Sequence, residues 1–293
     1  MTIGKWGVWF APNRMPLEDV GRLAGAVEGH GYDILWYPES VAFEAMALGS
    51  YYLGRTRKLN VASGIANIYA RDAAAAMQGH NSLNALYDGR FILGLGVSHM
   101  PMVENVRGHQ YGKPLGTMRA YLDAMYQTPV QVEAPERRVV LAALGPKMLA
   151  LSAEMADGAL PYNVTPEHTA RAREIMGPGK AIYVEQKICL TEDPAVAREV
   201  AAKQLAMYLV LPNYRNCWLS LGFTEDDLSG QGSERFLDAM VAWGSEATIR
   251  ARLQAHFDAG ADHVAIQPFD PAGGASPDWN ALAAFAPNFA SAA

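Results

Sequence analysis

The chain has 293 residues, a formal net charge of −6 and hydrophobic side chains at 50% of its positions. This length and composition are enough to fill one large core without a second domain. The basic residues are scattered along an acidic chain, so no cluster of positive charge is available to attract a phosphate backbone or an anionic membrane. We therefore expect neither a nucleic acid nor a membrane as a partner.

The spacing of cysteine and histidine disfavours several other classes of protein. Cys189 and Cys217 are too few for a disulfide framework and favour a reducing cytoplasm. The histidines show no HxH or HExxH spacing, so no metal site is predicted. The apolar run in MTIGKWGVWFAP, at the start of the chain, is too short for a signal peptide or a membrane span and is expected to form the first strand.

Short apolar runs, too brief for helices and bounded by Gly or Pro, recur along the whole chain and predict strands. The sixth run is the weakest of the eight. The runs lie at 5–10, 33–39, 59–65, 90–97, 139–145, 158–162, 181–190 and 263–269.

Amphipathic stretches separate these runs and predict helices. The first helix is expected from the apolar stripe at 17–27, which glycines follow. Another runs over 72–87, starting from an acidic cap. The remaining helices are predicted from the apolar stripe at 115–125 and from three capping residues, Thr165, Asp193 and Ser245.

Eight strands alternating with helices predict an α/β fold, a (β/α)8 barrel, as one domain over residues 1–293. In such barrels the active site lies at the carboxyl ends of the strands. A doubly wound open sheet is the alternative, although no GxGxxG follows the first strand. The segment at about 212–244 is too long for a plain connection and is expected to be an insertion, either a lid or a surface excursion.

Side chains alternate along a barrel strand between the helices and the barrel axis. Gly94, Gly96 and Ser98 are expected to face inward in the fourth strand, where the missing side chains would leave space for a flat ring. Glu185 and Lys187 are expected to form a buried structural pair, because unpaired charges there would be costly. The other residues expected to face inward are Tyr183, Cys189, His263, Ala265 and Gln267.

Several motifs occur in the order typical of one enzyme family. They are VASGIANIYARD (61–72), GRFILGLGVSH (89–99), VVLAALGPKMLALSAEMADGALPY (139–162) and AGADHVAIQ (259–267). On these motifs nearly the whole chain resembles the luciferase-like oxidoreductases, and most closely their branch that uses the deazaflavin coenzyme F420. The resemblance implies a barrel that binds a flavin or deazaflavin at the carboxyl ends of its strands. Because fold alone never licenses a function, each site residue needs its own argument.

The resemblance also implies where the cofactor lies. A non-proline cis peptide is expected under the ring at Gly64–Ile65, or at Ser63–Gly64 if the register is off by one; taken alone, Gly64 reads as a bulge or bend. Asn67 would hydrogen-bond a ring carbonyl. The turn at 143–147 would bind the phosphate through backbone N–H groups, or else it only starts a helix. The predicted cofactor-binding residues are Ser63, Gly64, Ile65, Asn67, Gly96, Val97, Ser98, Ala143, Leu144, Gly145 and Lys147.

Two residues are predicted to be catalytic. His99 is a candidate proton donor or substrate contact because imidazole titrates near neutral pH, and the alternative is a structural loop histidine. Glu39 ends the second strand, where some members of the family place an acidic residue near the ring. Ser40 and Val97 stand where sugar-phosphate dehydrogenases of the family carry a histidine and an acidic residue, which argues against a sugar-phosphate substrate.

An aromatic substrate pocket is predicted near these residues. The alternative for each tyrosine is core packing with a satisfied hydroxyl group. Arg71 and Asp72 are interpreted only as the start of a helix. The predicted substrate residues are Tyr69, Tyr162, Tyr208, Asn213 and Tyr214.

The resulting hypothesis is an oxidoreductase that uses coenzyme F420 to transfer hydride to or from a small organic substrate. The resemblance also makes a homodimer the expected assembly. The first alternative is an FMN-dependent monooxygenase of the same fold. The second is a cofactor-free barrel that binds a ligand or catalyses hydrolysis, although no GxSxG motif supports hydrolysis.

Overall fold

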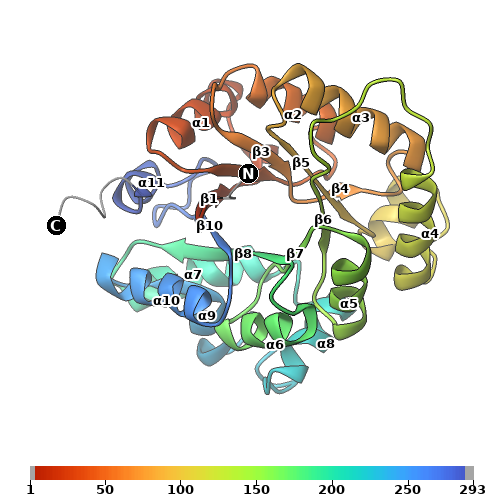
Figure 1. The fold of residues 1–293 in the computed structure, drawn as a ribbon. Helices are drawn as coiled ribbons and strands as arrows, with labels where there is room; N and C mark the ends of the chain where they lie inside the picture. The colour runs from red at the N-terminus through yellow and green to blue at the C-terminus, as the bar shows by residue number, and fades with distance from the viewer. Residues whose placement is uncertain (1–3, 288–293) are drawn as a thin grey trace.

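The computed structural model describes residues 4–287. Eight parallel strands form a barrel at its centre (Figure 1). They are β1 (Trp6–Trp9), β2 (Ile34–Tyr37), β3 (Asn60–Ser63), β5 (Phe91–Gly96), β6 (Val139–Ala142), β7 (Gly158–Leu160), β8 (Ala181–Cys189) and β10 (His263–Pro268). Pairing of β10 with both β8 and β1 closes the ring. Each predicted run contains one of these strands, and the predicted (β/α)8 barrel is confirmed.

Helices surround the strands in Figure 1. They are α1 (Leu17–Gly29), α2 (Ala45–Leu53), α3 (Ala73–Leu86), α4 (Pro114–Tyr126), α5 (Pro146–Met155), α6 (Pro166–Met176), α7 (Pro194–Leu205), α8 (Pro212–Ser220), α9 (Glu234–Met240), α10 (Glu246–Asp258) and α11 (Trp279–Ala284), with short turns η1 (Pro12–Arg14) and η2 (Met102–Val106). Within the described residues, no helix is long and apolar enough to cross a membrane.

The predicted helix caps are mostly present. Asp72, Asp193 and Ser245 each accept a hydrogen bond from a backbone N–H in the first turn of α3, α7 and α10. Thr165 precedes α6, but its side chain makes no such bond, so that predicted cap is wrong. Pro166 still favours a helix start there, because its fixed φ already suits the first helical position.

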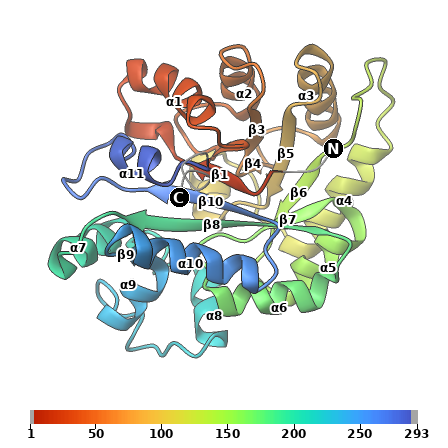
Figure 2. The same cartoon turned by 60° about the vertical axis from the view of Figure 1, so that its left-hand side comes forward.

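Two short strands add to the barrel and were not predicted. β4 (Ala66–Asn67) pairs with β5, and β9 (Val241–Trp243) pairs with the end of β8. Only the beginning of β8 pairs with β7. The chain leaves the barrel wall after β7, and the end of β8 pairs with β9 instead. Figure 2 shows α7, α9 and α10 grouped beside this long strand. The segment predicted as an insertion, 212–244, contains α8, α9 and β9.

The barrel interior is filled by side chains from every strand. The apolar members are Trp9, Ile34, Trp36, Ala62, Ile92, Val140, Leu160, Tyr183 and Ala265. His263 lies among them and accepts a hydrogen bond from the indole Nε1 of Trp36 at 3.2 Å. Glu185 and Lys187 are paired at 3.2 Å with only 1% of each side chain exposed, which confirms the predicted buried pair. Cys189 packs instead against side chains of α7, α8 and α9.

β3 and β5 approach each other closely at Gly94. The Ser63 hydroxyl donates to the Gly94 carbonyl at 2.9 Å and accepts from the Gly94 N–H at 3.0 Å. A Cβ atom on Gly94 would lie 1.9 Å from the carbonyl oxygen of Ser63. The space that was predicted for a ring at Gly94 is therefore taken by the backbone of β3.

Replacing Gly94 with Ala is expected to lower the free energy of unfolding by about 3 kcal/mol or more, because two backbone strands must move apart. Gly145→Ala is the matched control, since a Cβ there meets no atom within 4 Å. Urea denaturation of both variants measures the difference. Equal stabilities would show that β3 and β5 can separate at little cost.

Candidate active site

A pocket of about 1320 Å³ opens at the carboxyl ends of the barrel strands. Its lining comes from the ends of several barrel strands and the segments that follow β1, β2, β3, β5, β6, β7 and β10, together with parts of α6, α7 and α8. Active sites of (β/α)8 enzymes lie at this end of the barrel. Pockets for single small ligands usually measure about 300–1,000 Å³, so this one has space for a cofactor ring and a second small molecule.

Most of the predicted site residues line this pocket. They come from connections that are far apart in the sequence and that the barrel brings together. They are Glu39, Gly64, Ile65, Gly96, Val97, Ser98, His99, Ala143, Leu144, Gly145, Tyr162, Tyr208, Asn213 and Tyr214.

Four predicted site residues lie outside the pocket lining, which corrects their expected positions. The Ser63 hydroxyl is buried between β3 and β5. The side-chain oxygen of Asn67 accepts from the Tyr69 N–H at 2.9 Å, and the Tyr69 hydroxyl accepts from the Gly112 N–H at 2.9 Å. Lys147 is exposed in the first turn of α5. The polar groups of the first three therefore hold the surrounding connections in place.

The wall of the pocket after β3 is built around Gly64. Its peptide bond with Ile65 is cis, as predicted. The Nε1 of Trp9 donates to the Gly64 carbonyl at 3.1 Å, and a Cβ atom on Gly64 would lie 2.7 Å from this nitrogen. The side chain of Ile65 fills the position that a Cβ atom on Gly96 would need, at 2.6 Å. This wall therefore has no side chain at Gly64 or Gly96 projecting into the pocket.

Glu39 lines the pocket, but its carboxylate is fully engaged by protein groups. It pairs with Arg71, whose Nη1 lies 2.9 Å from Oε2, and accepts from the N–H of Asn67 at 2.8 Å and of Ala45 at 3.2 Å. Only 3% of the Glu39 side chain and 8% of the Arg71 side chain are exposed. Protein donors occupy both oxygens of this carboxylate. The geometry therefore favours a positioning role for Glu39 over the predicted catalytic role.

The turn after β6 brings the N-terminus of α5 to the pocket. Gly145 occupies the cap position and has no side chain to bond the first amides of the helix. Such free amides and the helix dipole form a site for a phosphate group. A ring nitrogen of His168 donates to the Leu144 carbonyl at 2.8 Å and so holds this turn in place. Burial lowers the pKa of His168, so its ring stays neutral at pH 7.

His99 and three tyrosines form the other side of the pocket. The ring of His99 lies 5.9 Å from that of Tyr214, and burial lowers the pKa of the imidazole below its usual value. The Tyr208 ring lies 4.9 Å from Tyr214 and 5.6 Å from Tyr162. Burial also raises the pKa of Tyr208 to about 12, so its hydroxyl keeps its proton at neutral pH. This side of the pocket is aromatic and uncharged.

Comparison with known proteins agrees with this fold. The family model of the luciferase-like monooxygenases matches residues 4–263. The chain belongs to this family. It is therefore an enzyme, and the resemblance read from the sequence motifs is confirmed.

Three proteins illustrate the similarity. A candidate coenzyme F420-dependent oxidoreductase of Mycobacterium tuberculosis is 26% identical in an alignment of 253 residues that covers 71% of each chain. The structure of an F420-dependent secondary alcohol dehydrogenase with an F420–acetone adduct matches at 14% identity and a TM-score of 0.76, covering 96% of both chains. The FMN-bound oxygenating constituent of 3,6-diketocamphane monooxygenase from Pseudomonas putida matches at 14% identity and a TM-score of 0.70, covering 97% of this chain and 96% of that one.

This member of the luciferase-like family has pocket residues that sequence reasoning missed. Trp9 is the last residue of β1, and Gln267 is the last but one of β10. Strand parity, which predicted Gln267 to face inward, was the signal that could have marked both. Phe269 and Tyr111 come from irregular connections and Met102 begins the short η2, so no periodic signal marks any of them.

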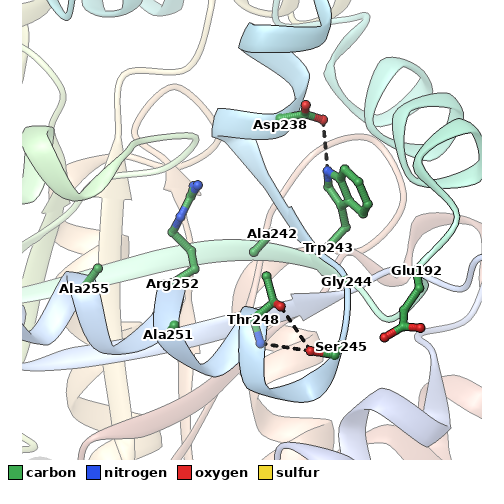
Figure 3. Close-up of a pocket in the computed structure, with 10 residues that line it drawn as sticks. All are labelled: Glu192, Asp238, Ala242, Trp243, Gly244, Ser245, Thr248, Ala251, Arg252 and Ala255. Carbon is green, nitrogen blue, oxygen red and sulfur yellow. Dashed lines mark hydrogen bonds between the residues drawn. The ribbon is translucent and has the colours of Figure 1, made fainter.

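A second and more open pocket lies outside the barrel mouth, between β9 and α10 (Figure 3). Several of its polar groups make contacts that hold the surrounding elements in place. Asp238 accepts from the Nε1 of Trp243 at 2.9 Å and pairs with Arg198, while Ser245 caps α10 by accepting from the Thr248 N–H at 3.3 Å. These contacts are structural, so the chemistry of the enzyme is expected at the barrel mouth.

Replacing Arg71 with Met is expected to lower the free energy of unfolding by about 3 kcal/mol, because the Glu39 carboxylate would stay buried without its partner. Adding Glu39→Gln should restore part of this loss. Arg119→Met is the control, because its partner Glu154 is exposed and the loss should be small. Urea denaturation measures all of the variants, and equal effects at Arg71 and Arg119 would contradict the positioning role.

Proposed function

We propose that this enzyme is a coenzyme F420-dependent oxidoreductase that transfers hydride between the deazaflavin ring and a small organic substrate. The observation that carries the proposal is the pocket itself, with its wall at Gly64, Ile65 and Gly96 beside the uncapped N-terminus of α5. Similarity to the M. tuberculosis protein and to the F420-dependent alcohol dehydrogenase supports the choice of cofactor. When bound, the cofactor supplies the hydride chemistry.

The residues of the chain would bind and orient the reactants. The backbone N–H groups of Gly145 and Lys147, on either side of Pro146, suit the cofactor phosphate. Trp9 and Ile65 form the wall on which the ring would rest. Tyr162, which with the neighbouring aromatic residues lines the opposite side, would exclude water from the reacting atoms. This arrangement leaves the protein the tasks of positioning and proton transfer.

His99 is the proposed proton carrier. It lines the pocket, and burial keeps its pKa below the ordinary value of 6.5. A neutral imidazole at pH 7 can accept the proton that a substrate loses on oxidation. In the opposite direction the protonated ring must donate, so reduction should become faster as the pH falls toward the lowered pKa.

The second candidate is an FMN-dependent monooxygenase. It is favoured by the similarity to the FMN-bound monooxygenase constituent, which covers nearly the whole chain. The two functions predict opposite cofactor preferences, so a binding experiment separates them.

Titration of the purified protein with coenzyme F420 and with FMN, followed by cofactor fluorescence, is expected to show tighter binding of F420. Gly145→Asp should weaken F420 binding about tenfold or more, because the carboxylate would occupy the free amides of α5 and repel the phosphate. Gly145→Ala, which adds no charge in open space, is the control. Tighter binding of FMN would replace the proposal by the second candidate, and binding of neither would remove both.

The imidazole of His99 is expected to titrate below pH 6.5 in an NMR titration, because burial disfavours its charged form. Tyr214→Ala should admit water beside the ring and raise the pKa toward 6.5. His99→Gln identifies the resonance, and it should lower turnover at least about a hundredfold if His99 carries the proton. An unshifted pKa in the wild-type protein would contradict the burial argument.

A homodimer and a cytoplasmic location remain predictions of this proposal. Sedimentation equilibrium of the purified enzyme would test the dimer.

A further inference from the structure

Gln267 presents an unused hydrogen-bond donor at the inner end of the pocket. It is the last inward-facing residue of β10, it lines the pocket, and only 4% of it is exposed. Its Oε1 accepts from the Tyr162 hydroxyl at 3.0 Å. Its Nε2 donates to no group within residues 4–287. An amide N–H group that reaches the pocket and has no partner among these residues is free to donate to a ligand or to water.

The orientation of this amide is set by a directed chain of hydrogen bonds. The Tyr208 hydroxyl donates to the Tyr162 oxygen at 3.3 Å. The proton of Tyr162 is directed at the Oε1 of Gln267, and in this arrangement the Nε2 of the amide faces away from Tyr162. The ring of Tyr162 lies over the Nζ of Lys187 at 3.8 Å, a cation–π contact that holds the ring in place.

The charges near this end of the pocket are kept below its surface. Lys187 pairs with Glu185 under the Tyr162 ring, and neither residue belongs to the pocket lining. Around Gln267 the pocket is lined by uncharged aromatic residues, namely Trp9, Tyr162, Tyr208, Tyr214 and Phe269. A charged ligand would lose its hydration here without gaining a partner of opposite charge. The lining therefore selects a neutral ligand with an apolar or aromatic body.

We propose that this end of the pocket binds neutral carbonyl compounds with a ring-shaped apolar body, whose oxygen accepts a hydrogen bond from the Nε2 of Gln267. The substrate class rests on the proposed function, because a hydride acceptor is needed there. In the reduction, the carbonyl carbon gains a hydride from the reduced cofactor, which becomes oxidised, and the oxygen gains a proton from the protonated imidazole of His99, the proton carrier proposed above. Negative charge grows on the oxygen as the C–H bond forms, so a fixed N–H donor helps the reaction. Tyr162 is the positioning residue of this site.

The test uses the enzyme loaded with oxidised F420, which cannot reduce a ketone, and compares 1-indanone carrying ¹³C at its carbonyl with indane. These probes have the same fused-ring skeleton and differ mainly in the carbonyl oxygen. We expect 1-indanone to bind about tenfold more tightly, the effect of one well-placed hydrogen bond. The carbonyl ¹³C resonance should move to higher frequency on binding.

Gln267→Met, which keeps the size of the side chain, should remove both the preference for 1-indanone and the ¹³C shift. Tyr162→Phe should reduce both, because the amide is then free to turn. Gln254→Met is the matched control on α10, where the exposed glutamine bonds only Asp258. Equal binding of the two probes in the wild-type protein, or an unchanged ¹³C shift in Gln267→Met, would overturn the proposal.

The failure of this inference can be told apart from the failure of the proposed function. If F420 binds and the enzyme shows no preference for 1-indanone, the role of Gln267 is wrong and the cofactor assignment stands. If F420 does not bind, the cofactor assignment is wrong. The ¹³C experiment on the cofactor-free protein then decides whether Gln267 binds a carbonyl oxygen, since that bond involves only the chain and the probe.

Discussion

The buried ion pair between Lys187 and Glu185 is the contact on which the inner end of the pocket depends. Burial lowers the pKa of Lys187 to about 8, against the attraction of the carboxylate. Such a pair persists only when further contacts satisfy it. Glu185 also accepts from the Asn163 N–H at 3.3 Å, and the Tyr162 ring covers Lys187. These contacts hold the chain where it leaves the barrel after β7, and so they fix Tyr162 and through it Gln267.

A second buried pair acts on the opposite wall. Glu39 and Arg71 join the connection after β2 to the connection after β4, and Glu39 also accepts the N–H of Asn67. In both pairs the carboxylate accepts from a backbone N–H of a pocket connection and from a cationic side chain. The charged groups of both pairs therefore hold irregular segments in place, and the aromatic end of the pocket stays neutral.

The fold could be predicted because strand alternation and helix capping are local properties, and the same alternation predicted that Gln267 faces inward. The contacts of the site could not be predicted in this way, because many of them join residues that are far apart in the sequence. The bond from Trp9 to the carbonyl of Gly64 joins residues 55 positions apart, and the partner of Arg71 depends on which connections the barrel brings together. Asn67 was predicted to reach the ligand, but its side-chain oxygen bonds the next turn instead. The periodicity of the sequence does not predict such hydrogen-bond partners.

The remaining charges of the pocket lie at its opening. Arg14, Arg171 and Lys203 line the pocket and are exposed to solvent, whereas Tyr214 and Gln267 are buried. The Lys203 charge is already paired with Glu199, and the guanidinium of Arg171 donates to Ser220. A ligand with a neutral ring and a negatively charged chain would match this gradient, because its ring would be desolvated inside while its charges stayed near water and near cations. The pocket thus suits a molecule that is apolar at one end and anionic at the other, together with a second, neutral molecule at the aromatic end.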